Sequence, residues 1–255
     1  MVAQRDGRMK SPLSVTKWGS GHANFVGLHG WGGSHKTFVP LINYLPQGIV
    51  IEAPDLPGCG QSSLPDRWRV ETIADMVSDS ISFESGFTII GNCTGGVIGA
   101  EMARIKPDLV KRLVMIDPFA YSPWYFALFL KGNFGRVAYR TAFASPIGRF
   151  FTNMALSGKR DGDTDLTSSF ERVDHDAVYS FLKMMGEHEG PSRYAGLALP
   201  IDIIIGENTF RAVEKSAAIL GEVWPHATLR VIQGAGHLPI EERSETLANL
   251  VFNYE

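Results

Sequence analysis

The 255-residue sequence lacks the features that mark several protein classes. Charged residues make up 20% of it, the formal net charge is −3 and no run of like charge occurs, so no nucleic-acid-binding surface is expected. Residues 1–10 are polar, with no continuous apolar stretch, and we expect neither a secretory signal nor a transit peptide. The two cysteines, Cys59 and Cys93, do not suggest a disulfide framework, which favours a reducing cytoplasm.

Residues that bind metals or cofactors are not grouped along the chain. Histidines, cysteines and carboxylates do not combine in a metal-ligand spacing, and no phosphate-binding fingerprint is present, so we expect no metal and no redox cofactor. The apolar run from Phe119 to Leu130 is shorter than the roughly 20 residues of a transmembrane helix. No transmembrane segment is therefore expected, and the sequence leaves the oligomeric state open.

The most informative stretch that is present runs from Gly91 to Gly96, with the sequence GNCTGG. The short apolar run Phe87–Ile90 before it is typical of a buried strand, and Val97–Ala103 after it is compatible with a helix. Glycines two residues before and two after Cys93 permit a turn sharp enough to hold its side chain above the sheet. On these residues alone, a buried and inert thiol is the alternative interpretation.

Strand and helix patterns alternate along the rest of the chain. Apolar runs predict further strands at Leu13–Trp18, Ala23–Leu28, Ile49–Ala53, Leu113–Ile116, Ile201–Ile205 and Thr228–Ile232. Helical spacing predicts helices at Thr37–Leu45, Val70–Ile81 and Glu241–Tyr254. The fold class is therefore α/β, with a mostly parallel sheet flanked by helices. Residues 1–118 and 200–255 are assigned to its core and residues 119–199, where the strand signal disappears, to an insertion.

The GNCTGG turn resembles the nucleophile elbow of the α/β-hydrolase fold, G-x-S-x-G, with cysteine in place of the common serine. The segment His29–Gly32 resembles the first oxyanion-hole loop of that family. The resemblance implies that the backbone N–H groups of Trp31 and Thr94 form an oxyanion hole. A further loop, Asp55–Ser62, resembles a structural loop of the family, so no chemistry is assigned to Asp55 or Cys59.

His237 is the histidine whose surroundings match the family. It lies in Gly234–Pro239, after the last predicted strand and before the last predicted helix, and it follows the family's chain order of nucleophile, acid and histidine. The resemblance therefore implies that His237 is the base. The six other histidines belong to the oxyanion loop, to the insertion or to loops without a motif.

The acid of the triad departs from the common family pattern. Where many members have aspartate at the end of a G-x-x-D pattern, this chain has Thr209, which supplies no negative charge. Some relatives, haloalkane dehalogenases among them, take the acid from the end of the strand after the elbow helix, a position held here by Asp117. Asp117 is the preferred acid and Glu207 the alternative. An Asp-Pro pair at a strand end also makes an ordinary turn.

The insertion resembles the helical cap of many family members. Its aromatic opening, Phe119–Leu130, fits either a roof over an apolar pocket or a packing face within the cap. The polar, glycine-containing segment 157–165 is expected to be an exposed loop.

These features predict an acyl hydrolase acting on a small, apolar ester, thioester or lactone through a triad of Cys93, His237 and Asp117. Because a thioester intermediate reacts readily with amines and thiols, acyl transfer is an alternative. A non-catalytic ligand-binding protein is a second alternative, favoured by the threonine at position 209. Dienelactone hydrolases and polyhydroxyalkanoate synthases resemble this fold with a cysteine elbow, but nothing in the chain assigns it to either. A third possibility is that Cys93 is an engineered replacement of a natural serine.

Overall fold

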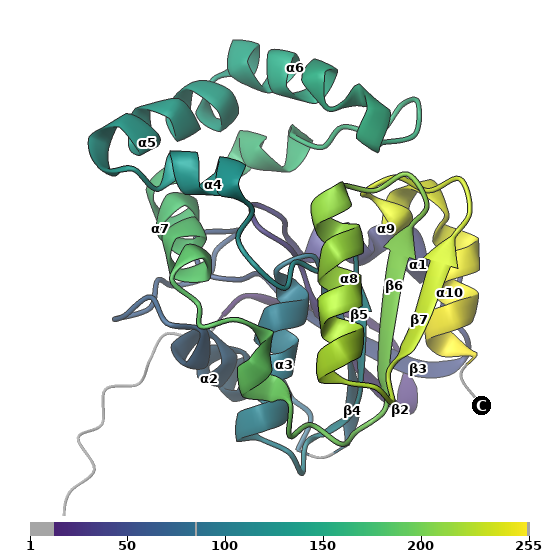
Figure 1. Cartoon of the computed structure of the whole chain (residues 1–255). Coiled ribbons are helices and arrows are strands. Elements are labelled where there is room, and N and C mark those ends of the chain that lie inside the picture. The colour runs from purple at the N-terminus through teal and green to yellow at the C-terminus, as the bar shows by residue number, and fades with distance from the viewer. Residues whose placement is uncertain (1–12, 85, 254–255) are drawn as a thin grey trace, which may run out of the picture.

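A computed structural model describes residues 13–84 and 86–253. The prediction about residues 1–10 and the predicted helix end at Tyr254 lie outside this part of the chain. Within it, seven strands form one sheet (Figure 1). Their order across the sheet is β1 (Val15–Gly19), β3 (Gly48–Pro54), β2 (Gly21–Leu28), β4 (Phe87–Asn92), β5 (Val110–Ile116), β6 (Ile201–Gly206) and β7 (Thr228–Ile232). Strand β1 is antiparallel to β3 and the other neighbouring pairs are parallel, as predicted.

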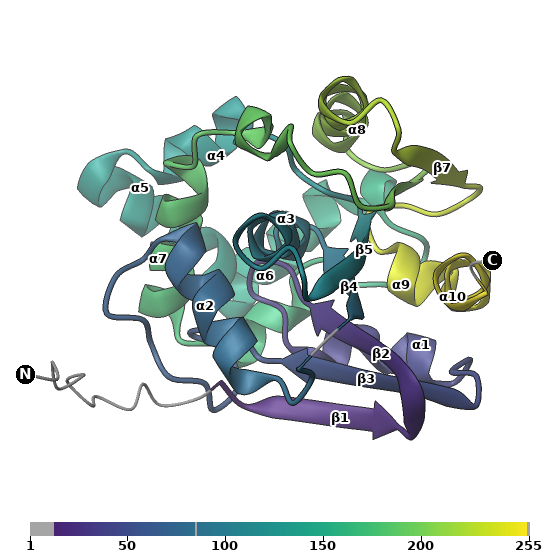
Figure 2. The same cartoon turned by 90° about the horizontal axis from the view of Figure 1, so that it is seen from below.

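Helices cover both faces of the sheet (Figure 2). One face packs against α2 (Val70–Ser80), α3 (Gly95–Ile105) and α8 (Arg211–Val223), and the other against α1 (Val39–Ile42), α9 (Pro239–Glu242) and α10 (Ser244–Phe252). Along β5, Leu113 and Met115 belong to the first core cluster, whereas Val114 and Ile116 belong to the second. Because both faces are buried, the strands read as continuous apolar runs rather than alternating ones.

Strand register brings three strand ends together. Asn92 of β4 is opposite Ile116 of β5, and Ile116 is opposite Ile204 of β6. The residues that follow these strands therefore gather at one edge of the sheet, the edge where parallel α/β sheets bind ligands. Cys93 and Asp117 both lie there.

The 119–199 segment contains four α-helices and no strand in any of its residues, all of which are described. The helices are α4 (Trp124–Phe129), α5 (Gly132–Tyr139), α6 (Pro146–Ala155) and α7 (His175–Gly186). Helices α5 and α6 lie farthest from the sheet, beyond the carboxyl ends of its strands (Figure 1). Among the described residues, no helix is both long and apolar enough to cross a membrane.

Two predicted helices differ from those observed. The predicted helix Thr37–Leu45 is a 3-10 turn, His35–Phe38, followed by the short α1, because Pro40 lacks the N–H that a continuous helix needs. The predicted helix from Glu241 onward is divided into α9 and α10 at Arg243, whose φ of −142° and ψ of 50° are not helical. The side chain of Arg243 donates to the carbonyl oxygen of Gly234 at 2.9 Å, so the break ties this helix pair to the preceding loop. Helix α8 was not predicted.

Candidate active site

Cys93 occupies a strained turn between β4 and α3. Its φ is +52°, and among the described non-glycine residues only Asp117, at +45°, also has a positive φ. A Cβ at Gly91 would lie 2.5 Å from the Cα of Gly96, and one at Gly95 would lie 2.1 Å from the carbonyl oxygen of Leu28. Glycine is therefore required on both sides of the turn. Strained non-glycine backbone is typical of functional sites, and here it sets both side chains at the same sheet edge.

The predicted oxyanion loop lies directly against Cys93. A Cβ on Gly30 would come within 2.9 Å of the Cβ of Cys93, so only glycine permits this approach. The loop is fixed by His29, whose Nδ1 lies 2.8 Å from its neighbour's carbonyl oxygen, while its Nε2 accepts from the N–H of Leu56 at 2.8 Å. Burial lowers the pKa of His29 to about 4, so the ring stays neutral and Nδ1 carries the proton that bonds the carbonyl.

Two backbone N–H groups are free to act beside Cys93. Within the described chain, neither the N–H of Trp31 nor that of Thr94 donates to another protein group. The Thr94 hydroxyl oxygen is also buried without a hydrogen-bond partner in that part of the chain. Both residues line the same cavity as Cys93. Unpaired N–H groups beside a possible nucleophile are the kind of donor that an oxyanion hole needs, and that role of Trp31 and Thr94 stays a prediction.

His237 and Asp117 are in direct contact. Nδ1 of His237 lies 2.8 Å from Oδ2 of Asp117, and the aspartate is fully buried. The N–H of Gly206 donates to Oδ1 of Asp117 at 2.8 Å. The imidazole and the ring of Phe210 pack in a T-shaped arrangement, with centroids 4.8 Å apart. The ring is thus held on its nitrogen side by a carboxylate and on its flank by an aromatic group.

Thr209 occupies the position at which many family members have the acidic residue. Its hydroxyl donates to Oδ2 of Asp117 and lies 3.4 Å from Nδ1 of His237. A threonine therefore fills the common acid position and supports the carboxylate that arrives from β5. Sequence reasoning identified Thr209 only as a missing acid. Its contact with Asp117 depends on how the loops after β5 and β6 meet, which no local motif reveals.

The electrostatic balance at His237 favours the protonated ring. Burial lowers its pKa, but hydrogen bonds to Asp117 and Cys93, together with the negative charges of both partners, outweigh burial and raise the pKa to about 10. The side chain is 13% exposed, so the ring is not completely enclosed. A positively charged ring therefore lies beside the Cys93 thiol at neutral pH.

Glu207, the alternative acid, lies elsewhere. Its carboxylate accepts from the N–H of Gly234 at 2.8 Å, and the residue is exposed. In the described chain it makes no hydrogen bond to His237. Asp55 likewise bonds a residue other than Cys93. Its Oδ1 accepts from the backbone N–H of His35 at 2.7 Å.

A cavity of about 280 Å³ opens beside Cys93. Its wall is largely apolar and includes Phe119, Pro123 and Phe126 from the aromatic opening of the insertion. Trp124 of the same opening is instead 81% exposed. The stretch thus lines a cavity with some side chains and faces solvent with others, so neither of the two predicted roles describes it completely.

The insertion and the oxyanion loop share one aromatic cluster. The indole N–H of Trp31 donates to the carbonyl oxygen of Val178 in α7 at 2.9 Å. Its ring packs at centroid distances of 4.8 to 5.9 Å against Phe126, Tyr139, Phe143 and Phe170. The position of Trp31 is therefore set by the insertion as much as by the sheet.

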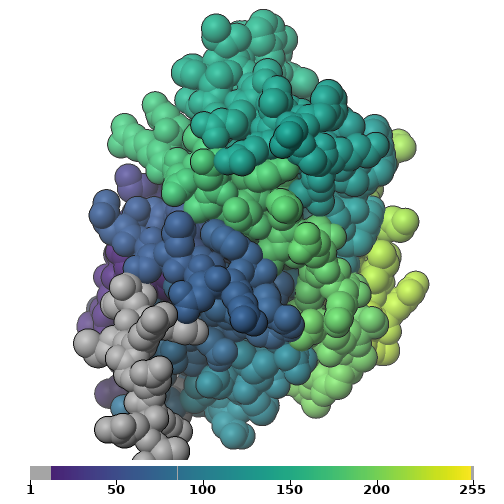
Figure 3. Space-filling view, turned by 90° about the vertical axis from the view of Figure 1, so that its left-hand side faces the viewer, coloured from purple at the N-terminus to yellow at the C-terminus, as the bar shows by residue number. Residues whose placement is uncertain are grey.

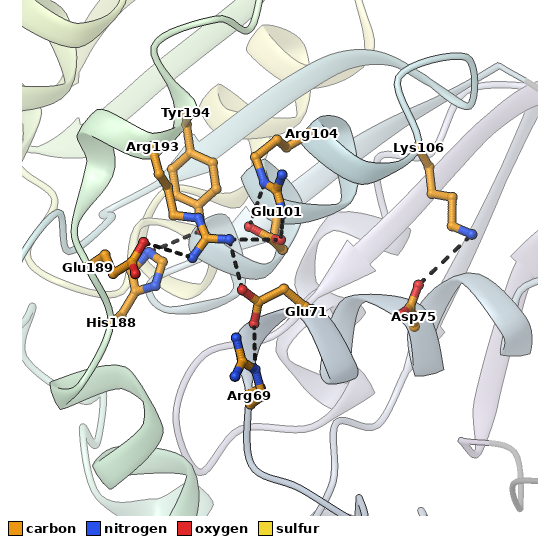
Figure 4. Close-up of polar contacts among 10 residues, drawn as sticks. All are labelled: Arg69, Glu71, Asp75, Glu101, Arg104, Lys106, His188, Glu189, Arg193 and Tyr194. Atoms are coloured by element: carbon orange, nitrogen blue, oxygen red, sulfur yellow. Dashed lines mark hydrogen bonds and ion pairs between the residues drawn. The ribbon is translucent and has the colours of Figure 1, made fainter.

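Two of the residues that line the cavity, His188 and Glu189, belong to a polar network (Figure 4). His188, which lines the cavity, stacks on Tyr194 and lies 3.0 Å from its hydroxyl oxygen through Nε2. Burial and the positive charge of Arg193 lower the pKa of His188. The guanidinium of Arg193 bridges Glu71 at 2.8 Å and the fully buried Glu101 at 3.4 Å. The network joins the end of the insertion to α2 and α3.

The polar segment 157–165 makes contacts that its composition did not predict. Much of it is exposed, but the backbone N–H of His237 donates to the carbonyl oxygen of Lys159 at 2.8 Å. The ammonium group of Lys159 donates to the carbonyl oxygen of Thr209 at 2.9 Å. A residue of the insertion therefore contacts both loops around Asp117. Among the described residues, no group of three or more His, Cys, Asp and Glu side chains is arranged to hold a metal ion.

Comparison with known proteins defines the class of protein. Residues 24–244 match the family model of the alpha/beta hydrolase fold, and the chain belongs to this family. Its sequence is 22% identical over 251 residues to a pimeloyl-[acyl-carrier protein] methyl ester esterase of Yersinia pestis, covering 92% of this chain and 94% of that protein.

Solved structures show the same fold. A thermophilic esterase from Thermogutta terrifontis matches with a TM-score of 0.77 and 19% identity, over 94% of this chain and 92% of that one. An enol-lactonase from Burkholderia xenovorans matches with a TM-score of 0.72 and 16% identity, over 94% and 95% of the respective chains. The predicted fold class is confirmed.

Proposed function

We propose that this chain is an ester hydrolase in which Cys93 is the nucleophile, His237 the acid and base, and Asp117 the group that orients the imidazole. The observation that carries the proposal is the 2.8 Å contact between His237 and a fully buried Asp117, at the sheet edge where Cys93 projects toward a cavity. The esterases and the lactonase among its relatives and structural neighbours support the same reaction class.

The proposed reaction begins with attack of the Cys93 thiolate on the ester carbonyl carbon. The carbonyl oxygen takes the negative charge and accepts hydrogen bonds from the N–H groups of Trp31 and Thr94. When the C–O bond breaks, the imidazolium of His237 gives its proton to the departing alkoxide, and the acyl group stays on Cys93 as a thioester.

Hydrolysis of the thioester completes the cycle. The now neutral His237 removes a proton from water as the oxygen attacks the acyl carbon. The C–S bond breaks, the carboxylic acid leaves, and Cys93 returns to the thiolate beside the imidazolium. Asp117 keeps Nδ1 of His237 in place throughout, so that Nε2 faces the reacting atoms.

We also propose that residues 119–199 act as a cap over the core formed by residues 1–118 and 200–255. Apolar side chains of the cap border the cavity beside Cys93, which favours a small, apolar acyl group. The volume of about 280 Å³ lies near the lower end of ligand pockets, so long acyl chains are disfavoured.

A panel of p-nitrophenyl esters of increasing chain length, with acyl-coenzyme A thioesters alongside, tests the proposal. We expect a burst of p-nitrophenol close to one equivalent of enzyme, followed by slow turnover, because thiolate attack is fast and water reacts slowly with a thioester. The Cys93→Ala variant removes the burst, whereas Cys59→Ala retains it. A burst that survives in Cys93→Ala, or no burst with any acyl substrate, contradicts the proposed nucleophile.

Adding a small thiol or amine acceptor distinguishes hydrolysis from transfer. The cysteine at position 93 favours the alternative of acyl transfer, because its thioester is more readily cleaved by thiols and amines than by water. A steady state that accelerates with acceptor concentration, with the acyl group recovered on the acceptor, makes the protein an acyltransferase. An unchanged rate with only free acid as product supports the hydrolase.

A further inference from the structure

Helix α6 presents its apolar side to the outside of the molecule. Ile147, Phe150, Phe151 and Met154 are three and four residues apart and so share one helix face. All four are more than half exposed, between 54% and 73%. Such a stripe on a globular protein normally faces the core, but none of the residues of α6, all of them described, is buried.

Helix α5 extends this surface. Phe134 is 65% exposed and Val137 is 64% exposed, and they lie three residues apart on the helix. Helices α5 and α6 form the end of the molecule farthest from the sheet, which protrudes at the top of both views (Figures 1 and 3). We call this surface the crown, made up of Phe134, Val137, Ile147, Phe150, Phe151 and Met154.

The segment that carries the crown has charge of one sign only. Residues 119–160 contain six basic residues and no aspartate or glutamate, in a chain whose net charge is −3. The basic residues are Lys131, Arg136, Arg140, Arg149, Lys159 and Arg160. Arg136 and Arg140 both pair with one acid from α7, Asp176, at 2.8 and 2.9 Å. Lys159 bonds Thr209 of the core, and three aspartates follow Arg160 in the sequence. The excess of positive charge is therefore confined to the region of α5 and α6, where Lys131, Arg136, Arg140 and Arg149 are balanced only by the shared Asp176.

We propose that the crown binds the surface of an anionic lipid bilayer. Exposed Phe, Ile and Met side chains enter the boundary between headgroups and acyl chains, and the surrounding Lys and Arg contact lipid phosphates, the combination that places amphipathic helices at membrane interfaces. A second copy of this chain does not fit, because it brings a surface of the same charge. A protruding surface also suits a bilayer, which accepts aromatic rings without a matching groove.

The test measures binding without any ester substrate, so it is independent of the proposed function. The protein is sedimented with vesicles of phosphatidylcholine alone and of phosphatidylcholine mixed with phosphatidylglycerol. We expect binding to the mixed vesicles only. Ile147→Glu/Phe150→Glu should weaken it about tenfold or more, and Lys131→Glu about tenfold, because each change removes apolar insertion or reverses a charge near the phosphates. The matched control is Leu64→Glu, at a position 53% exposed and outside the crown.

Thermal unfolding followed by circular dichroism shows that each variant is folded before its binding is compared. Failure of the wild type to bind the mixed vesicles overturns the proposal, as does an equal loss in Leu64→Glu. A dimer in light scattering that Ile147→Glu/Phe150→Glu dissociates assigns the crown to a second copy instead. Binding to soluble polyglutamate that survives the same double substitution assigns the positive charges to an acidic protein, which also overturns the proposal.

Discussion

The two cysteines of this chain lie in similar turns and have different surroundings. Cys59 has Gly58 and Gly60 beside it, much as Cys93 has glycines two residues to either side. Cys59 is buried, and burial, with the negative charge of Asp55, raises the pKa of its thiol to about 12. Cys93 is half-buried, borders a cavity and lies beside His237.

A glycine-rich turn alone therefore does not make a thiol reactive. Glycine permits the backbone turn in both loops, and both cysteines are free thiols. What differs is the surroundings: Cys59 is buried beside a carboxylate, and both conditions oppose its thiolate, whereas Cys93 borders a cavity and lies beside an imidazole held by Asp117. Substitutions and labelling at these two loops should show how much each neighbour contributes to this difference.

The largest effect is expected from Asp117→Asn. An amide cannot balance the imidazolium and leaves His237 in the wrong tautomer, so turnover of a p-nitrophenyl ester should fall roughly 10³ to 10⁴-fold with the fold intact. Steady-state kinetics measures the fall in turnover, and circular dichroism shows whether the fold is intact. The control is Glu207→Gln, which should change turnover little because Glu207 bonds Gly234 instead. A large loss in the control with none in Asp117→Asn reverses the assignment of the acid.

Iodoacetamide should label Cys93 roughly 10³-fold faster than Cys59 in the folded protein at pH 8, because a thiol with a pKa of about 12 is almost wholly protonated there. Peptide mass spectrometry over time gives both rates from one sample. In His237→Ala the rate at Cys93 should fall toward that of an ordinary thiol, while Cys59 should be unaffected. Equal rates for the two cysteines in the native wild type contradict the proposed site.

His29 links the two cysteine loops, since it bonds Gly30 beside Cys93 and Leu56 near Cys59. Its folded-state pKa is lowered to about 4, so the stability it contributes is present above pH 6.5 and is lost as pH falls toward 4. Between pH 6.5 and 5, the free energy of unfolding measured in urea should fall by about 2 kcal/mol more in the wild type than in His29→Gln. The exposed His22, changed to Gln, is the control and should leave the pH dependence of wild type unchanged.

The smallest effect is expected at Thr209. Replacing it with valine removes one hydrogen bond to the carboxylate of Asp117 and should lower kcat/KM about tenfold. The pH profile of kcat/KM should shift as well, because the carboxylate acts on the imidazole. Thr209→Ser keeps the hydroxyl and should restore both quantities. A loss in stability without any change in the profile would make Thr209 a packing residue only.

Much of the fold was readable from the sequence. Strand β7 begins and ends at the predicted residues, and the predicted Ile201–Ile205 run lies within β6, because buried parallel strands leave long apolar, β-branched runs. The helix break at Arg243 was not predicted, since it depends on a carbonyl in the loop before it. Helix α8 was not predicted, although its buried residues Ala212, Val213, Ala217 and Leu220 have helical spacing.

The sequence predicted the residues of the candidate site that lie in local motifs. GNCTGG and the His237 loop each have a recognisable sequence, and strand order placed Asp117 at the same edge as Cys93. The roles of these residues remain predictions. The contacts of Thr209 and Lys159 were not foreseeable, because they join segments 28 to 92 residues apart through hydrogen bonds that follow from strand register and loop shape.

Lys159 couples two loops of the core through one residue of the 119–199 segment. Its carbonyl oxygen accepts from the backbone of His237, and its ammonium group holds the carbonyl oxygen of Thr209. A single residue of the 119–199 segment thus holds backbone groups of the His237 loop and of the Thr209 loop. A change at Lys159 therefore acts on the two loops that flank Asp117 together.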